Sequence, residues 1–155
     1  MTQRDMSVFD QHSLDALLAK QACYDLVMRF VACNDRRDPQ GLGSLFAEKG
    51  VLVRPNGDTL VGPAAITAAY ALRPAERLTR HLMGNVLIDV TSADSAIGSS
   101  TVLLWSGSAH DAPGPFGRPA KGPQVMGEFE DTFVRTALGW RIARREARFT
   151  FVRDA

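Results

Sequence analysis

Residues 78–90 read LTRHLMGNVLIDV, and this stretch decides the fold class because the hydrophobic pattern changes there. Before it, apolar residues recur every three or four positions, as they do in amphipathic helices. From Leu78 onward they alternate with polar residues, as in strands that bury one face. Helices followed by a run of long strands predict an α+β domain whose sheet packs against the helices.

Four long strands are expected after this change, at roughly 79–90, 95–108, 124–136 and 140–152. Turns at Ser92–Asp94 and Ala137–Gly139 join the first two and the last two strands, which predicts antiparallel pairing. Segment 107–123 contains four Pro and four Gly and is interpreted as a mobile loop. A sheet of such long strands would curl around the helices and leave a cavity between the two layers.

The first expected helix covers residues 13–35, with Ser13 as its N-cap. Residues 1–12 are interpreted as an N-terminal extension ahead of a single domain at 13–152. The sequence shows no internal repeat and no linker between domains, since the Pro- and Gly-rich loop joins two strands of one meander.

Two further helices and a hairpin are expected before the long strands. A helix begins at Pro39 and ends at Gly50, because proline is well tolerated in the first turn of a helix. Residues 51–62 then alternate around Asn56-Gly57, which is a strong hairpin signal. The third helix covers residues 63–73 and ends before a proline.

Composition and charge favour an ordinary globular domain. The 155 residues are 45% hydrophobic and 23% charged, with 18 Lys and Arg against 17 Asp and Glu. This balance gives no reason to expect nucleic acid or an anionic membrane as a partner. No apolar run approaches the roughly 20 residues of a membrane span, so a cytoplasmic location is expected. Residues 141–149, RIARREARF, carry five charges and are interpreted as the solvated face of the last strand.

Cysteine and histidine spacing gives no sign of a metal site. Cys23 and Cys33 lie ten positions apart in one expected helix, about 15 Å along its axis and about 80° from a shared face. Neither a disulfide nor a two-thiolate metal site closes that distance. The three histidines also lack metal-ligand spacing. No metal and no cofactor are therefore expected.

Asp35 interrupts an apolar stripe on the first expected helix. Within about 40° of one another on a helical projection lie Leu17, Tyr24, Met28 and Val31. Asp35 falls on the same stripe, and a carboxylate on a buried helix face is costly unless it is paired. Two other interpretations stay open. Asp35 could lie beyond the buried part of the helix, or it could cap the next helix, for which Asp38 is better placed.

His81 poses the same question on the first long strand. Alternation places His81 and Met83 on the inward face, and Gly84 is a candidate bulge that would switch the phase of the strand. A lone inward histidine is more often a hydrogen-bonded core residue than a base. A histidine that meets an inward aspartate has a fixed tautomer and a stabilised imidazolium. The residues alone do not show whether His81 and Asp35 meet.

The whole pattern resembles the SnoaL-like branch of the nuclear transport factor 2-like superfamily. The resemblance rests on the order of the elements and on CNDRRDPQGLGSLFAEKGVL (33–52), TRHLMGN (79–85) and FEDTFVRTALGWRIARRE (129–146). It covers roughly residues 13–151. It implies a cone-shaped α+β barrel, in which a curved antiparallel sheet wraps around the N-terminal helices and encloses an apolar pocket. It also implies a homodimer or a homotrimer.

Within that superfamily, the chain is most similar to the scytalone dehydratase and hexachlorocyclohexane dehydrochlorinase group. In this group an aspartate at the end of the first helix pairs with a histidine on the first long strand. Asp35 and His81 match these two positions. The resemblance implies that the histidine removes a proton and that water or a halide is lost.

The sequence departs from that group at several polar positions. Asn34 stands where the dehydratase has a tyrosine, and Phe129 stands where it has an asparagine. Ser106 takes the place of a second histidine, although His110 is close by in the loop. Arg135 is the nearest candidate for the basic residues that assist the leaving group in the dehydrochlorinase. These departures argue against scytalone itself as the substrate.

Two hypotheses from different classes follow. The first is a cofactor-independent lyase or isomerase that acts on a small hydrophobic molecule, with His81 as the base and Asp35 as the residue that orients it. The alternative is a non-catalytic ligand-binding protein, or a structural subunit resembling the β-subunit of ring-hydroxylating dioxygenases. The sequence also offers candidate walls for a ligand pocket, although plain core packing is the commoner role of large apolar residues. The candidates for these walls are Tyr24, Met28, Val31, Asn34, Trp105 and Phe129.

Overall fold

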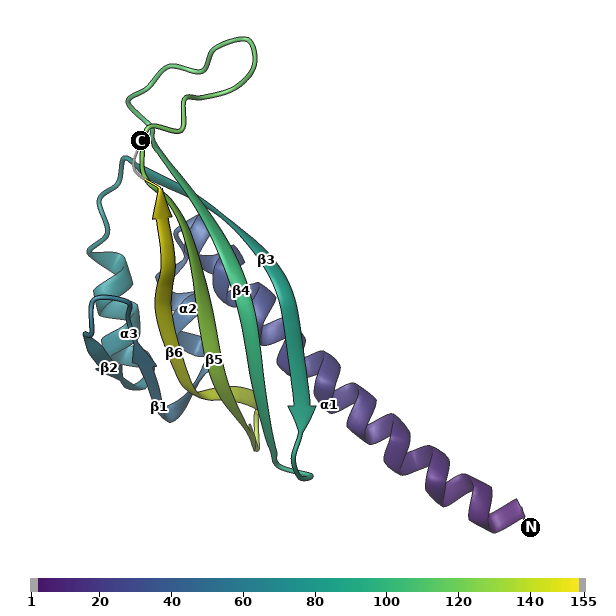
Figure 1. Cartoon of the computed structure of the whole chain (residues 1–155). Coiled ribbons are helices and arrows are strands. Elements are labelled where there is room, and N and C mark those ends of the chain that lie inside the picture. Colours follow the sequence, from purple (N-terminus) through teal and green to yellow (C-terminus); the bar gives the residue numbers. More distant parts are fainter. Residues whose placement is uncertain (1–2, 154–155) are drawn as a thin grey trace.

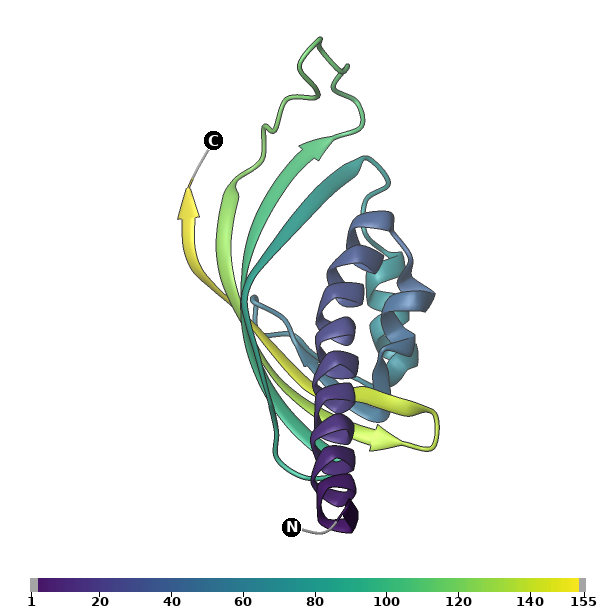
Figure 2. The ribbon, with the colours of Figure 1, turned by 90° about the vertical axis from the view of Figure 1, so that its right-hand side faces the viewer.

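The computed structural model describes the backbone of residues 3–153 and the side chains of residues 11–153. The elements, in chain order, are α1 (Gln3–Arg36), α2 (Pro39–Ser44), β1 (Phe46–Val53), β2 (Thr59–Val61), α3 (Gly62–Ala71), β3 (Arg77–Val90), β4 (Ser95–Ser108), β5 (Gln124–Thr136) and β6 (Gly139–Arg153). One curved sheet carries all the helices on its concave side (Figure 2). The expected α+β class and the four long strands are therefore confirmed.

The strand order of the sheet is β2-β1-β6-β5-β4-β3. The four long strands pair antiparallel with their sequence neighbours, as expected. The pairing of β1 with β6 is parallel, so the sheet is antiparallel across its long strands but not throughout. These two strands are far apart in sequence, and no tight hairpin between them imposes an antiparallel direction. Since β2 and β3 are the two edges, the sheet stays open and does not close into a barrel.

A bulge in β3 decides which of its side chains face the helices. The pairing with β4 shifts register between Gly84 and Leu87. Met83 and Val86 consequently both face inward, so the expected switch of phase is confirmed. The left-handed backbone falls on Asn85, with φ of 47°, rather than on the glycine. Asparagine tolerates this conformation better than most residues with a Cβ atom.

Helix α1 begins at Gln3, so Ser13 is not its N-cap and residues 3–12 continue the helix. No glycine or proline interrupts the chain between Gln3 and Ser13, and nothing there stops a helix. The first turns project beyond the sheet (Figure 1), and residues 11–18 are exposed. Residues 1 and 2 of the expected extension lie outside the described part.

Helix α2 is shorter than expected and ends at Ser44 instead of Gly50. The residues that follow belong to β1, which pairs with β6 on one side and β2 on the other. Tertiary pairing thus overrides the local preference for helix. Asp38 caps α2, because its side chain accepts a hydrogen bond of 2.8 Å from the backbone N–H of Gly41. The cap interpretation therefore applies to Asp38 and not to Asp35.

The buried face of α1 differs from the expected stripe. It consists of Ala19, Cys23, Leu26, Val27, Phe30, Val31 and Asn34. Leu17 and Tyr24 are 62% and 38% exposed, so the expected stripe is centred roughly 100° away from the true one. An apolar pattern that continues around more than one face of a helix does not single out the buried one.

A buried ion pair joins β5 and β6 beneath α1. Arg145 is fully buried and donates from Nε and Nη2 to the two carboxylate oxygens of Asp131, at 2.7 and 2.6 Å. Its guanidinium lies between the rings of Phe30 and Phe129, 4.4 and 4.3 Å from their centroids. The expectation that all charges of residues 141–149 are solvated was therefore wrong.

Within residues 3–153, no helix is both long enough and apolar enough to cross a membrane.

Candidate functional site

The C-terminal end of α1 is held in a fixed position next to the start of β3. The N–H of Asp38 donates to the carbonyl of Cys33 at 2.9 Å, and the N–H of Arg37 donates to the carbonyl of Asn34 at 3.2 Å. With φ of 60° at Arg37, these are the two bonds of a Schellman motif. The motif ends the helix sharply and places Asn34 and Asp35 in its last turn.

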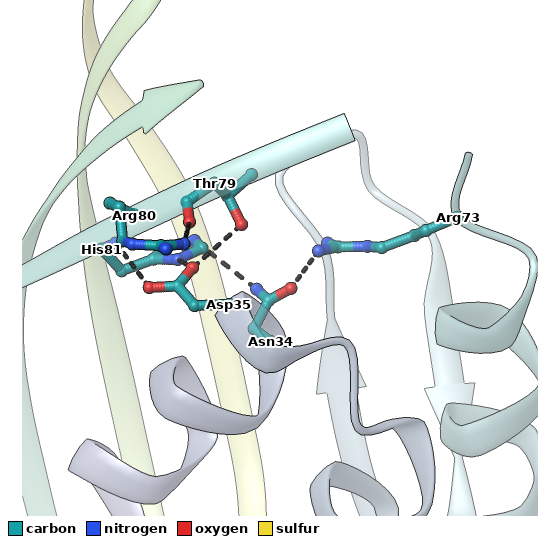
Figure 3. A network of polar contacts seen from close by, with 6 residues as sticks. All are labelled: Asn34, Asp35, Arg73, Thr79, Arg80 and His81. Carbon is teal, nitrogen blue, oxygen red and sulfur yellow. Dashed lines mark hydrogen bonds and ion pairs between the residues drawn. The ribbon is translucent and has the colours of Figure 1, made fainter. Parts of the chain in front are cut away.

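Asp35 and His81 are in direct contact. The Nδ1 atom of His81 lies 2.6 Å from Oδ1 of Asp35, and the backbone N–H of His81 donates to Oδ2 at 2.9 Å. The hydroxyl of Thr79 donates to Oδ1 at 2.9 Å. Figure 3 shows the carboxylate enclosed by these groups at the end of α1. The structure thus brings together the two residues that the family resemblance implied as partners.

The carboxylate of Asp35 is suited to remain ionised. Burial tends to raise its pKa, but the hydrogen bonds from the ring and backbone of His81 and from Thr79 lower the pKa below its ordinary value overall. The side chains of His81 and Asp35 are only 9% and 15% exposed. A fixed negative charge beside Nδ1 would stabilise the imidazolium that forms when His81 takes up a proton.

Asn34 and Arg73 fix the tautomer of the histidine. The side-chain oxygen of Asn34 accepts a hydrogen bond from Nη1 of Arg73, and its Nδ2 lies 3.5 Å from Nε2 of His81. Because arginine has only donors, the amide must turn its oxygen to Arg73 and its N–H groups to His81. Nε2 is then an acceptor, and the proton of the neutral ring lies on Nδ1, where it is donated to Asp35.

His81 lines a cavity of about 250 Å³ between the sheet and the helices. Asn34, which lies next to Nε2, also lines it, whereas Asp35 at Nδ1 does not, so we infer that the Nε2 edge of the ring faces the cavity. Its apolar wall includes Phe30, Leu52, Val102, Leu104, Val125 and Phe129. Its polar lining includes Asn34, Thr79, His81 and the arginines Arg54, Arg73 and Arg77. Asp35 does not line the cavity and contacts only the Nδ1 edge of the ring. The imidazole of His81 therefore lines a space that is bounded by both apolar and cationic side chains.

The pocket residues expected from the sequence divide into two groups. Asn34 and Phe129 line the cavity. Four others, Tyr24, Met28, Val31 and Trp105, do not line it. Tyr24 and Met28 were assigned to the wrong face of α1, whereas Val31 belongs to the buried face but does not reach the cavity. Trp105 is 40% exposed and points away from the helices, because its neighbour Leu104 takes the inward position on β4.

The residues considered as replacements for missing polar groups do not reach the cavity either. Ser106 and Arg135 lie outside its lining, and Arg135 is exposed near the opposite end of β5. His110 is exposed in the loop between β4 and β5. Over residues 11–153 no three His, Cys, Asp or Glu side chains are grouped as metal ligands.

Sequence reasoning missed Thr79 and the arginines. Thr79 could have been found, because alternation places it on the same face of β3 as His81. Arg73 carried no signal of its own, since the sequence marks it only as the residue before Pro74 at the end of a helix. Its relevance comes entirely from the tertiary contact with Asn34.

Arg37 holds the segment that carries Arg73. Its guanidinium donates to the carbonyls of Arg73 at 3.0 Å, Pro74 at 2.5 Å and Ala75 at 2.8 Å. These bonds tie the loop after α3 to the end of α1. The backbone at Arg37 is left-handed, a conformation that usually favours glycine. An arginine at this position supplies a side chain that holds the segment carrying Arg73.

Comparison with known proteins gives consistent results. The profile of the SnoaL-like domain matches residues 15–146. No curated protein matches the chain. A solved structure assigned as a scytalone dehydratase from Novosphingobium aromaticivorans DSM 12444 is similar with a TM-score of 0.76 and 23% identity, covering 92% of this chain and 91% of that one.

Two further solved structures have the same fold. A type 2 hexachlorocyclohexane dehydrochlorinase superposes with a TM-score of 0.79 and 18% identity, over 92% of this chain and 93% of that one. A protein assigned as an aromatic ring hydroxylase from N. aromaticivorans gives 0.72 and 19%, over 90% and 94%. Likeness at these identities shows the shared fold alone. Because the domain profile covers most of the sequence, the chain belongs to the SnoaL-like domain family and has the nuclear transport factor 2-like fold.

Proposed function

We propose that the protein is a cofactor-independent lyase or isomerase that removes a proton from a small hydrophobic molecule. His81 is the base, and Asp35 orients its ring. One observation supports this most directly: Nε2 of His81 faces a cavity as an acceptor, while Nδ1 is bound at 2.6 Å to a carboxylate that lies outside that cavity.

The proposed step is a transfer of one proton. The C–H bond of the substrate breaks, its proton goes to Nε2, and its electron pair moves into the substrate. In a lyase, that pair forms a double bond and expels a neighbouring group such as hydroxide or halide. In an isomerase, the proton returns to another carbon. Asp35 stabilises the imidazolium in both cases, and general base catalysis of this kind contributes about 10²–10⁴-fold to a rate.

The shape and lining of the cavity support a small and mainly apolar substrate. Most of its lining side chains are apolar, among them the rings of Phe30 and Phe129. A largely apolar space strengthens electrostatic interactions with the charge that develops near His81. The fold neighbours assigned as a dehydratase and a dehydrochlorinase are in keeping with this chemistry.

The alternative is a non-catalytic ligand-binding protein or a structural subunit like that of a ring-hydroxylating dioxygenase. The cavity would serve a binding protein equally well. The enzyme is favoured because a hydrogen-bonded carboxylate behind a cavity-facing imidazole has no use in simple binding of an apolar molecule. Co-purification with an iron–sulfur subunit would instead favour the alternative.

Turnover of a panel of small hydrophobic compounds tests the proposal. The compounds carry an acidic C–H next to a carbonyl group and a hydroxyl or chloride on the following carbon. Proton NMR in D₂O follows both loss of the substituent and deuterium uptake. We expect the unaltered protein to convert at least one compound and His81→Ala to lose at least about 10²-fold of that rate. Unchanged turnover in His81→Ala would exclude this mechanism. Arg135→Gln, an exposed position outside the cavity, is the matched control.

A further inference from the structure

Three arginines line the cavity beside the proposed base. Arg54 follows β1, Arg73 follows α3, and Arg77 is the first residue of β3. Among the described side chains, only Asp58 forms an ion pair with any of them, with Arg54 at 3.3 Å, and this aspartate is more than half exposed. The lining of the cavity therefore combines cationic side chains with apolar ones.

Arg73 has donors left over for a ligand. Its guanidinium lies 4.2 Å from the centroid of the Tyr70 ring, and one of its N–H groups is used by Asn34. An arginine side chain carries five N–H donors in a planar fork that matches the two oxygens of a carboxylate. No carboxylate of residues 11–153 forms an ion pair with Arg73.

The surroundings of Arg73 favour an added negative charge. Burial lowers the pKa of its guanidinium below the ordinary value, and the charges of Arg77, Arg54 and Arg37 lower it further. A cation that is partly buried among other cations is stabilised when an anion binds next to it. The apolar residues across the cavity require the rest of such a ligand to be hydrophobic.

We propose that the cavity binds a hydrophobic carboxylic acid as its anion, with the carboxylate on the Arg73 guanidinium and the apolar body against Phe129 and Val102. This proposal names the class of substrate for the proposed function. Binding of the acid does not depend on the proposed function, and only the reaction that follows binding rests on it. Asn34 bridges Arg73 and His81, as Figure 3 shows. A carboxylate on Arg73 would place the adjoining carbon atoms near Nε2. Arg73 would then also stabilise the negative charge that develops on the carboxylate as the proton leaves.

Binding of acids and of their neutral amides, measured by calorimetry, tests this inference without requiring turnover. The probes are three acid and amide pairs of similar shape: 1-naphthoate and 1-naphthamide, 4-phenylbutanoate and 4-phenylbutanamide, octanoate and octanamide. We expect at least one acid to bind about tenfold or more tightly than its amide, because hydrogen bonds to charged groups are strong. Arg73→Gln should lose most of this preference and keep the affinity for the amide. Arg73→Lys, which retains the charge without the fork, should be intermediate.

Two controls separate this inference from the proposed function. Arg135→Gln should keep the full preference for the acid, since this arginine lies outside the cavity. His81→Asn should also keep it, because the residue that binds the carboxylate is intact. Loss of turnover with preserved acid binding in His81→Asn would support both proposals, and acid binding without any turnover would overturn only the proposed reaction. The inference is wrong if no acid binds more tightly than its amide, or if the preference survives in Arg73→Gln.

Discussion

Among residues 11–153, a buried pair of an acid and a base differs in almost every respect from a partly buried one. Asp131 and Arg145 are 1% and 0% exposed at the side chain and meet in two parallel hydrogen bonds between aromatic rings. Asp35 and His81 are 15% and 9% exposed and meet at one edge of the imidazole, while its other nitrogen faces a cavity. The Asp131–Arg145 pair is shut off from solvent. In the Asp35–His81 pair, the imidazole also lines a cavity.

This difference separates a structural role from a proposed chemical one. A guanidinium that is fully enclosed cannot exchange its partner without exposing a buried charge. An imidazole whose second nitrogen is contacted only by the amide of Asn34, at 3.5 Å, can take up and release a proton while its carboxylate stays in place. Burial of an ion pair therefore does not by itself identify a site, whereas a histidine that lines a cavity is a candidate for one.

The largest effect on stability is expected at the Asp131–Arg145 pair. Asp131→Ala leaves the buried guanidinium of Arg145 without a counter-ion, and we expect the free energy of unfolding to fall by about 3–5 kcal/mol. Urea unfolding followed by circular dichroism measures this. The double variant Asp131→Leu/Arg145→Met removes both charges and should recover most of the loss. A loss below about 1 kcal/mol in Asp131→Ala would show that the two pairs do not differ in the way described.

A smaller effect is expected at the Asp35–His81 pair, where the change is measured as a loss of turnover rate. Asp35→Asn keeps the size of the side chain but removes the charge that stabilises the imidazolium. We expect turnover of a substrate found in the NMR screen to fall by about 10²-fold or more. The free energy of unfolding should fall less than in Asp131→Ala. Stability lost to the same extent as in Asp131→Ala, with turnover retained, would assign Asp35 a structural role.

The fold was largely predictable from the sequence, and the errors of the prediction have physical causes. The long strands were found because each buries one face, so that their alternation is a direct imprint of the tertiary structure. Helix boundaries were less accessible. Phe46 begins a strand inside an expected helix, because pairing with β6 outweighs the local preference. Gln3 begins α1 because a solvent-exposed extension of the helix leaves no apolar pattern to mark it.

The candidate site was predictable only in part. Asp35 and His81 were identified because a family resemblance joined two residues that are 46 positions apart. Their contact depends on the end of α1 lying against β3, which no local pattern encodes. Arg73 was missed for the same reason, since its partner Asn34 is 39 positions away. Tyr24 and Trp105 were expected in the cavity because large apolar residues look alike in sequence whichever face they occupy.

The smallest expected effect is the dependence of stability on pH. Since the folded pKa of Asp35 is below its ordinary value of 3.8, the carboxylate stabilises the fold above that pH. This contribution is lost as the pH falls through the lower, folded value. The difference in unfolding free energy between the unaltered protein and Asp35→Asn should shrink as the pH is lowered from about 5 through the ordinary carboxyl pKa of 3.8. A difference that grows on acidification would contradict the lowered pKa.

The state of the His81 ring in the free protein tests the central claim most directly. Long-range ¹H–¹⁵N correlation spectra at alkaline pH report which imidazole nitrogen carries the proton. The account predicts a protonated Nδ1 and an unprotonated Nε2, held by Asp35 and by the amide of Asn34. In Asp35→Asn this preference should weaken. A proton on Nε2 in the unaltered protein would contradict the account, because the nitrogen that faces the cavity would then not be a base.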